Sequence, residues 1–144
     1  MTAVATPPVA GIDPRGPRFA AALTSVVLAV TVLTGTIWVL AAQVALFAVG
    51  AFAGVQRTPY AAIFRRVIRP RLSPPADLED PAPPRFAQLV GLVVTGVALL
   101  AAGAGVGLAV EVGAGLALIA AILNAVFGLC LGCELYLLIR RARG

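Results

Sequence analysis

The longest stretch without a charged residue is the feature that most constrains how this chain folds. Between Arg18 and Arg57 lie 38 residues, 19–56, with no Asp, Glu, Lys or Arg among them. At about 1.5 Å per residue, one helix of that length would be nearly twice as long as a hydrocarbon core of about 30 Å is thick. We therefore expect two membrane spans, joined by a turn at Thr34-Gly35-Thr36.

The second half of the chain repeats this plan. Residues 86–110 form an uncharged block between Arg85 and Glu111, and residues 112–133 form another before Glu134. Only 12% of the chain is charged, whereas soluble domains carry about 25%. The sequence predicts an all-α membrane protein with four transmembrane helices arranged as two hairpins, the second turning at Glu111.

The distribution of basic residues predicts the orientation. All eleven are arginines, and they lie before the first span, between the hairpins and after the last span, with none at either hairpin tip. The positive-inside rule then places both termini and the central loop in the cytoplasm. We expect a multi-pass protein of the plasma (cytoplasmic) membrane. Because the arginines flank apolar blocks, membrane lipid is the expected partner and nucleic acid is not.

These boundaries divide the chain into five segments. We expect a cytoplasmic N-terminal segment at 1–18, transmembrane hairpin 1 at 19–56 and a cytoplasmic loop at 57–85. Transmembrane hairpin 2, at 86–139, carries both cysteines, and residues 140–144 form a cytoplasmic tail.

The central loop begins with a pattern typical of an amphipathic helix that lies on the membrane surface. Thr58 and Pro59 form a helix start and Pro70 a stop; an extension of the second span is the alternative. A proline-rich, extended linker is expected at 72–84. The apolar residues with helical spacing are Tyr60, Ile63, Phe64, Val67 and Ile68.

A short repeat precedes the first span of each hairpin. Residues 13–20, Asp-Pro-Arg-Gly-Pro-Arg-Phe-Ala, match residues 80–87, Asp-Pro-Ala-Pro-Pro-Arg-Phe-Ala, at six of eight positions without a gap. Two explanations remain open from the sequence: duplication of a hairpin, or convergence on residues that suit the start of a membrane helix.

The motif with the most chemistry is Cys130-Leu131-Gly132-Cys133-Glu134. Cysteines three residues apart on a helix can reach disulfide distance, and a CxxC pair supports reversible thiol–disulfide exchange. We expect the pair in the inner half of the fourth span, with Cys130, Cys133 and Glu134 on one helical face. In this redox hypothesis these three are the catalytic residues, and Glu134 accepts a proton from Cys130.

Two other roles for the cysteines stay open. They can be small hydrophobic residues in the bundle interior, or two chains can together supply four thiolates to a soft metal. One chain has no histidine and too few ligands by itself, so we expect neither a metal site nor a cofactor within it.

Further residues have candidate supporting roles. Asp13, Arg15, Arg18 and Arg140 either stabilise a thiolate or serve structure, by pairing with each other and with lipid headgroups. Asn124, Gly128 and Gly132 predict a face where helices pack closely, within one chain or in a homo-oligomer.

Two motifs resemble one known family. Residues 13–19 before the first span and Cys130-Leu131-Gly132-Cys133-Glu134-Leu135-Tyr136 in the last resemble domain of unknown function 4395, a family of small bacterial, largely actinobacterial, membrane proteins. The resemblance implies a multi-span inner-membrane protein. It also implies genes near those for thioredoxin-like or sulfurtransferase proteins, which makes such a cytoplasmic protein a candidate partner.

The sequence thus supports three functional hypotheses. The first is a membrane thiol–disulfide or sulfur-relay component that acts through Cys130 and Cys133. The second is a non-enzymatic membrane scaffold or assembly factor, and the third is a small transporter. The sequence does not decide whether the protein is an enzyme.

Overall fold

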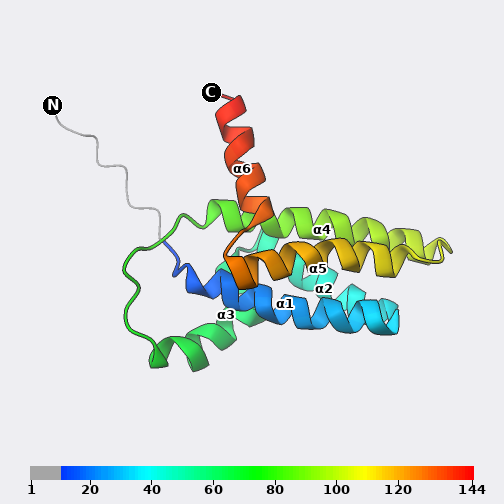
Figure 1. Ribbon diagram of the computed structural model, residues 1–144, viewed down its shortest axis with the longest axis horizontal. Helices are drawn as coiled ribbons and strands as arrows, with labels where there is room; N and C mark the ends of the chain where they lie inside the picture. Colours follow the sequence, from blue (N-terminus) through cyan, green and yellow to red (C-terminus); the bar gives the residue numbers. More distant parts are fainter. Residues whose placement is uncertain (1–10) are drawn as a thin grey trace.

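A computed structural model describes residues 11–144, and in this part of the chain all the regular elements are helices (Figure 1). The predicted all-α fold is confirmed. Helix α3 continues through a π-helical turn, Phe64–Ile68, and a 3-10 turn, Arg69–Arg71. The α-helices are α1 Arg15–Thr34, α2 Ile37–Phe52, α3 Pro59–Ile63, α4 Ala82–Gly103, α5 Ala109–Phe127 and α6 Leu131–Ala142.

Four of these helices form a bundle. Helix α1 lies beside α2 and α5, and α4 also lies beside α2 and α5, so that α1 is diagonal to α4. Leu28, Leu40 and Ala114 are fully buried between them. Helices α4 and α5 approach so closely at Gly113 that a Cβ there would collide with Ala98. Small side chains thus allow close packing where lipid supplies no hydrophobic driving force between helices.

Three helices, α1, α4 and α5, are long and apolar enough to cross a membrane. Helix α2 is apolar but has 16 residues, about 24 Å of helix against a core of about 30 Å. The predicted count of four spans is therefore not reached. The reason is local: Gly35 (φ +64°) ends α1 and Gly54 (φ +114°) follows α2, so turns take up part of the uncharged stretch.

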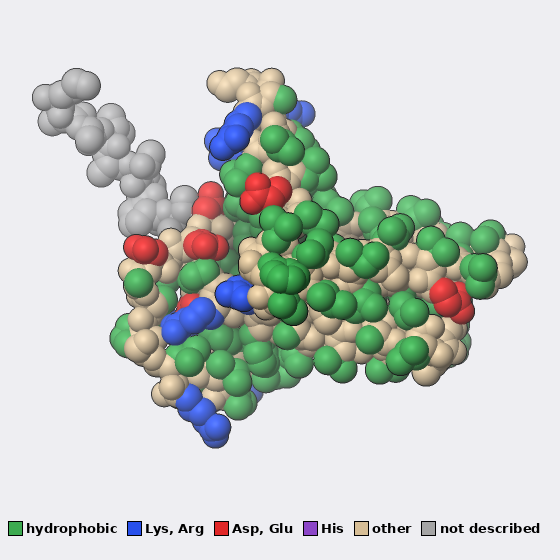
Figure 2. All heavy atoms as spheres, viewed as in Figure 1, with side chains coloured by type: hydrophobic (Ala, Val, Ile, Leu, Met, Phe, Trp, Pro, Cys, Tyr) green, Lys and Arg blue, Asp and Glu red, His purple; other side chains and the backbone are tan. Residues whose placement is uncertain are grey.

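The outer surface of the bundle is apolar. Figure 2 shows hydrophobic side chains over its length, and arginine side chains gathered at the end that holds the loops and near α6. Leu33 is 85% exposed and Trp38, beside the first hairpin turn, is 79% exposed. Apolar patches of this extent are rare on soluble monomers, and they fit helices surrounded by lipid.

The second hairpin differs from the sequence prediction at both ends of α5. The turn lies at 104–108, where Gly105 has φ +93°, and Glu111 belongs to the first turn of α5 instead. The predicted last span continues beyond residue 127, whereas α5 ends at Phe127. The reason is Gly128, which adopts a left-handed conformation (φ +69°) and donates its N–H to the Asn124 carbonyl. Helix α6 then projects away from the bundle, steeply inclined to α4 and α5 (Figure 1).

The predicted helix in the central loop is confirmed, with its start at Thr58. The Thr58 hydroxyl accepts a hydrogen bond from the Ala61 N–H at 3.2 Å, and Pro59 is the first helical residue. Of the predicted apolar face only part turns inward, because Phe64 is buried while Ile63 and Val67 are exposed.

The repeated motifs pair with each other in space. Ile12 and Glu79, which are 67 residues apart, form an antiparallel β-bridge with N–H···O=C distances of 2.9 and 2.8 Å. The next residues, Asp13 and Asp80, also behave alike. The Asp13 carboxylate accepts a hydrogen bond from the Arg15 backbone N–H at 3.0 Å, and the Asp80 carboxylate accepts one from the Ala82 backbone N–H at 2.9 Å. Contact between equivalent residues is the expected signature of a two-fold axis.

The arginine that the two repeats share, Arg18 in the first and Arg85 in the second, binds the other half of the molecule. Arg85 donates from Nε to the Ala51 carbonyl and from Nη2 to the Phe52 carbonyl, both at 2.7 Å, at the end of α2. Arg18 donates from Nη2 to the Ala125 and Val126 carbonyls, at 3.2 and 3.3 Å, near the end of α5. Both guanidinium groups satisfy carbonyls that have no partner within their own helix.

The symmetry extends beyond the repeated motif. Phe19 packs against Phe64 with ring centroids 5.8 Å apart, and the equivalent Phe86 packs against Tyr136 at 5.7 Å. Convergence on a helix-start motif would not explain these matched contacts in distant elements. The structure favours duplication: α1, α2 and α3 form one unit, α4, α5 and α6 form another, and a pseudo-two-fold axis relates them.

Replacing Arg85 by Ala should lower the free energy of unfolding by about 2 kcal/mol, because two carbonyls lose a charged donor. Arg18→Ala should cost less, since its contacts are longer. The measurement is thermal unfolding in detergent micelles, with Arg143→Ala as control, because exposed Arg143 has no side-chain hydrogen bond to any described residue. Equal effects of Arg85→Ala and Arg143→Ala would contradict the assigned role.

Candidate functional site

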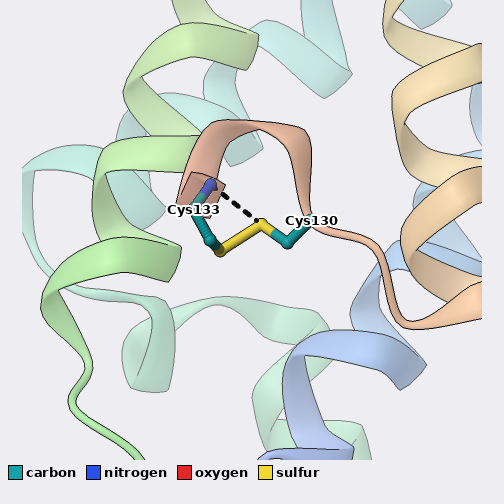
Figure 3. The surroundings of a disulfide bond; sticks show 2 residues. All are labelled: Cys130 and Cys133. Atoms are coloured by element: carbon teal, nitrogen blue, oxygen red, sulfur yellow. Dashed lines mark hydrogen bonds between the residues drawn. A yellow bond between two sulfur atoms is a disulfide. The ribbon is translucent and has the colours of Figure 1, made fainter. Parts of the chain in front are cut away.

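The two cysteines lie where α6 begins, and they form a disulfide (Figure 3). Cys130 has an extended backbone and is the N-cap of α6, while Cys133 is the third helical residue; their Cα atoms are 5.2 Å apart. The predicted position inside the fourth span is therefore wrong, because α5 has already ended. Cys130 also does not share a helical face with Cys133 and Glu134, since it precedes the helix.

Packing of α6 against α4 holds the disulfide in place. Gly132 lies directly on α4: a Cβ at this position would be 2.5 Å from the Ala87 Cα atom. One turn later, Tyr136 packs against Phe86. At the other side of the pair, the Leu129 N–H donates to the Leu123 carbonyl at 3.1 Å. The CxxC loop is thus tied to both α4 and α5.

The start of α6 is suited to a reactive sulfur. The Cys133 N–H donates a hydrogen bond to the Cys130 sulfur at 3.2 Å (Figure 3). In the reduced protein, the same N–H and the positive end of the helix dipole would stabilise a thiolate at Cys130. Both cysteines are partly exposed, so a partner can reach them. The arrangement distinguishes the two sulfurs and favours Cys130 as nucleophile.

Glu134 lies outside the three helices that can span a membrane. Its side chain is exposed, in the first turn of α6, and no hydrogen bond to either sulfur is present among the described residues. Its position therefore does not carry the high cost of a carboxylate buried in lipid. Arg140 lies further along α6, with its guanidinium carbon 6.0 Å from the centre of the Tyr136 ring.

Asp13 and Arg15 form an ion pair with each other. Arg15 donates from Nε and Nη2 to the Asp13 carboxylate at 3.0 and 2.8 Å, and also to the Ser73 carbonyl at 2.9 Å. The hydrogen bond from Arg15 holds the pKa of the Asp13 carboxyl below its ordinary value, against the opposing effect of burial. This pair joins the start of α1 to the linker before α4.

The predicted packing residues have three different positions. Gly132 contacts α4, Gly128 terminates α5, and Asn124 lies in the last turn of α5 beside a cavity. Gly103 and Gly107 are four residues apart, like Gly128 and Gly132. No atom of another element lies within 4 Å of the place where a Cβ would be at either of them, so they do not mark a packing contact.

A cavity of about 650 Å³ extends from the disulfide into the bundle. Cys130 and Cys133 line it together with Gln43 of α2, which is 1% exposed. The Tyr60 hydroxyl, also on the wall, donates to the Gln43 Oε1 atom at 2.9 Å. Burial raises the pKa of Tyr60, so the hydroxyl keeps its proton at neutral pH. Apolar walls with a few polar groups are typical of ligand sites.

Gln43 and Tyr60 were missed at the sequence level. An available signal was the position of Gln43, a carboxamide well inside a 38-residue uncharged stretch, where polar groups are costly unless they have a partner. Tyr60 was assigned to the apolar face of a surface helix. Only the fold brings its hydroxyl to Gln43.

The described residues contain no group of three or more His, Cys, Asp or Glu side chains that could hold a metal ion. The structure therefore offers, within residues 11–144, the disulfide and the adjacent cavity as its chemically capable features.

Comparison with known families agrees with the sequence motifs. Residues 12–141 match the family described as "Domain of unknown function (DUF4395)". The chain belongs to this family. In this DUF4395 protein the match includes both repeated units, the disulfide and the residues of the cavity named above. No curated protein and no solved structure matches the chain.

In the reduced DUF4395 protein, Cys130 should be alkylated several-fold faster than Cys133, because only the Cys130 sulfur accepts the helix N–H. Iodoacetamide labelling of Cys130→Ser and Cys133→Ser variants at neutral pH, followed by peptide mass spectrometry, measures each thiol alone. Serine is a good N-cap, so Cys130→Ser should keep α6 intact. Equal labelling rates would contradict the distinction between the two sulfurs.

The Asp13–Arg15 pair should make stability depend on acid pH. A carboxyl with a lowered pKa stabilises the fold above its unfolded value of about 3.8, and this contribution disappears as pH falls through the folded-state pKa. The difference in unfolding temperature between wild type and Asp13→Asn should therefore shrink below about pH 4. Asp77→Asn is the control variant, because Asp77 is exposed and has no ion pair with any described residue.

Proposed function

We propose that the protein is a membrane component of thiol–disulfide exchange, with Cys130 and Cys133 as its redox pair. The observation that carries the proposal is the hydrogen bond from the Cys133 N–H to the Cys130 sulfur at the start of α6. It gives one sulfur a stabilised thiolate, while the partner sulfur is close enough to resolve a mixed disulfide.

Comparison of the two repeated units supports a special role for the pair. In the first unit, Thr58 caps α3 and accepts the Ala61 N–H. In the second unit, Cys130 caps α6 and accepts the Cys133 N–H in the same way. Thr58 is sufficient for capping, so cysteine is not needed to start the helix. The second unit has cysteines, Cys130 and Cys133, where the first unit has Thr58 and Ala61. A role in sulfur chemistry explains both cysteines better than helix capping does.

The exchange has two steps. The Cys130 thiolate attacks a disulfide of the partner, so that a mixed disulfide forms and one partner thiolate leaves. The Cys133 thiolate then attacks the Cys130 sulfur, which forms the Cys130–Cys133 disulfide and releases the second partner thiolate. The partner gains two electrons and the CxxC pair loses them; the reverse sequence oxidises the partner. In a sulfur relay, Cys130 would instead accept the terminal sulfur of a persulfide.

The membrane arrangement belongs to the same proposal. Helix α2 is the symmetry counterpart of α5, which is long enough to cross, so we place α2 as a fourth, short span with local adjustment of the bilayer. The arginine-bearing end would face the cytoplasm by the positive-inside rule, at the plasma membrane. Cytoplasmic thiols are kept reduced, so the disulfide would be one state of a cycling pair.

The proposed partner is a cytoplasmic thioredoxin-like or sulfurtransferase protein. Partial exposure of both cysteines at the end of the bundle allows access by another protein. Exposed apolar side chains of α6, including Leu131, Leu135 and Leu138, give this helix a face that suits the membrane surface. The reactive sulfurs would then lie at the level of the headgroups.

Cys133→Ser should accumulate a mixed disulfide between Cys130 and the partner, because the resolving sulfur is gone. Non-reducing electrophoresis of native membranes, with and without dithiothreitol, detects the adduct, and mass spectrometry identifies its bond. Cys130→Ser is the matched control and should accumulate no adduct.

If neither single variant forms an adduct, the redox function is wrong. If the double variant Cys130→Ser/Cys133→Ser still restores the function of a deletion strain and still binds its partner, the scaffold hypothesis is correct instead.

A further inference from the structure

The cavity beside the disulfide has the features of a second substrate site. It is lined both by the two sulfurs and by groups deep in the bundle, so a molecule inside it can reach the redox pair. The volume of about 650 Å³ lies within the range of small-molecule sites. The proposed exchange also leaves the pair to be regenerated: after it reduces a partner it is a disulfide and must be reduced, and after it oxidises a partner it is a dithiol and must be reoxidised. A redox-active molecule in the cavity can regenerate it.

The deepest polar group in the cavity wall is an oriented donor. Gln43 is 99% buried, and its Oε1 atom already accepts the Tyr60 hydroxyl. That hydrogen bond identifies the other side of the carboxamide as the N–H₂ group. This nitrogen has no hydrogen bond to another described residue, and Gln43 lines the cavity. Its N–H₂ group can therefore donate to a hydrogen-bond acceptor of a ligand there.

The remaining wall restricts the ligand further. The residues contributed by the middle of the helices are neutral: Phe47, Leu46, Val94 and Leu116 are apolar, and Thr24 and Gln88 are uncharged. Charged side chains on the wall come from loops and helix ends, and Arg18 already binds two carbonyls. The interior therefore suits a neutral ring with carbonyl oxygens and an apolar substituent, and does not suit a sulfur oxyanion.

We propose that this cavity binds a membrane quinone, which reoxidises the Cys130–Cys133 dithiol after the pair has oxidised its partner; the inference rests on the proposed thiol–disulfide function, running in the reverse direction given above. A quinone carbonyl accepts the Gln43 N–H, and the isoprenoid chain extends along the apolar wall. Tyr60 is a positioning residue, because its hydroxyl orients the Gln43 carboxamide.

The redox step balances without another reactant. The Cys130 thiolate adds to a ring carbon of the quinone, and the ring oxygen takes up one proton. The Cys133 thiolate then attacks the Cys130 sulfur, the S–S bond forms, and the C–S bond breaks. Its electron pair leaves with the ring, which takes up a second proton and becomes the hydroquinone. The two thiols lose two electrons and two protons, and the quinone gains both.

The test uses the full chain in lipid nanodiscs, reduced and then freed of reductant. Ubiquinone-1 is a suitable probe because its ring is fully substituted and therefore disfavours a stable thiol adduct. Quinone absorbance and a thiol-specific mass shift should show one quinone consumed per disulfide formed. Gln43→Leu should raise the half-saturating quinone concentration about tenfold. Tyr60→Phe should raise it severalfold, and it serves as a second variant if Gln43→Leu does not fold.

Thr95→Val is the matched control. Thr95 is 0% exposed and donates to the Gly91 carbonyl at 2.7 Å, so this variant also removes a buried polar group, but away from the cavity wall. Its quinone dependence should equal that of wild type. If Gln43→Leu and Tyr60→Phe also equal wild type, the quinone reacts elsewhere and the cavity site is wrong.

A parallel reaction separates this inference from the proposed function. Oxidised thioredoxin, a soluble disulfide probe, should oxidise the reduced wild-type protein. If thioredoxin reacts and ubiquinone-1 does not, the quinone site is overturned and the exchange function stands. If neither oxidises the dithiol, the exchange function itself fails.

Discussion

The guanidinium groups of Arg18 and Arg85 each connect one half of this protein to a helix end in the other half, and the elements that follow those ends carry the candidate site. Arg85 binds the end of α2, and Arg18 binds the end of α5. Each guanidinium group satisfies carbonyls that would otherwise lack a partner at a helix end. Helices α3 and α6 begin within a few residues of these ends, so the same contacts lie beside the two places where the chain leaves the bundle.

The two-fold arrangement also shows where the units differ. Both units start a helix with a side chain that accepts the N–H three residues later, a hydroxyl at Thr58 and a sulfur at Cys130. The capping requirement is the same, but only sulfur can exchange electrons. The cavity beneath the disulfide extends this asymmetry, since Gln43 has no carboxamide counterpart in α5. A duplicated scaffold thus carries a site on one side only.

Much of the fold could be predicted, because long uncharged stretches, glycine turns and the Thr58-Pro59 helix start are local features. The helix at 59–71, the turn at Gly35 and the all-α class follow from them. The end of α5 could not be predicted, since Gly128 lies within a continuous apolar run and its left-handed conformation leaves no trace in hydropathy. That one turn moved Cys130 from a span to a helix N-terminus. The Gln43–Tyr60 pair was equally hidden, because it joins residues from different elements.

The sequence by itself determined that the chain is helical and apolar, that its arginines lie outside the long uncharged stretches, and that it has one CxxC motif. These properties depend on composition and on neighbours along the chain. Only the tertiary structure decided how the two units associate, which cysteine receives the helix N–H, and which groups line the cavity beside the sulfurs. Those features depend on contacts between residues that are distant in the sequence. They also depend on backbone turns such as the one at Gly128, which a glycine allows but does not by itself require.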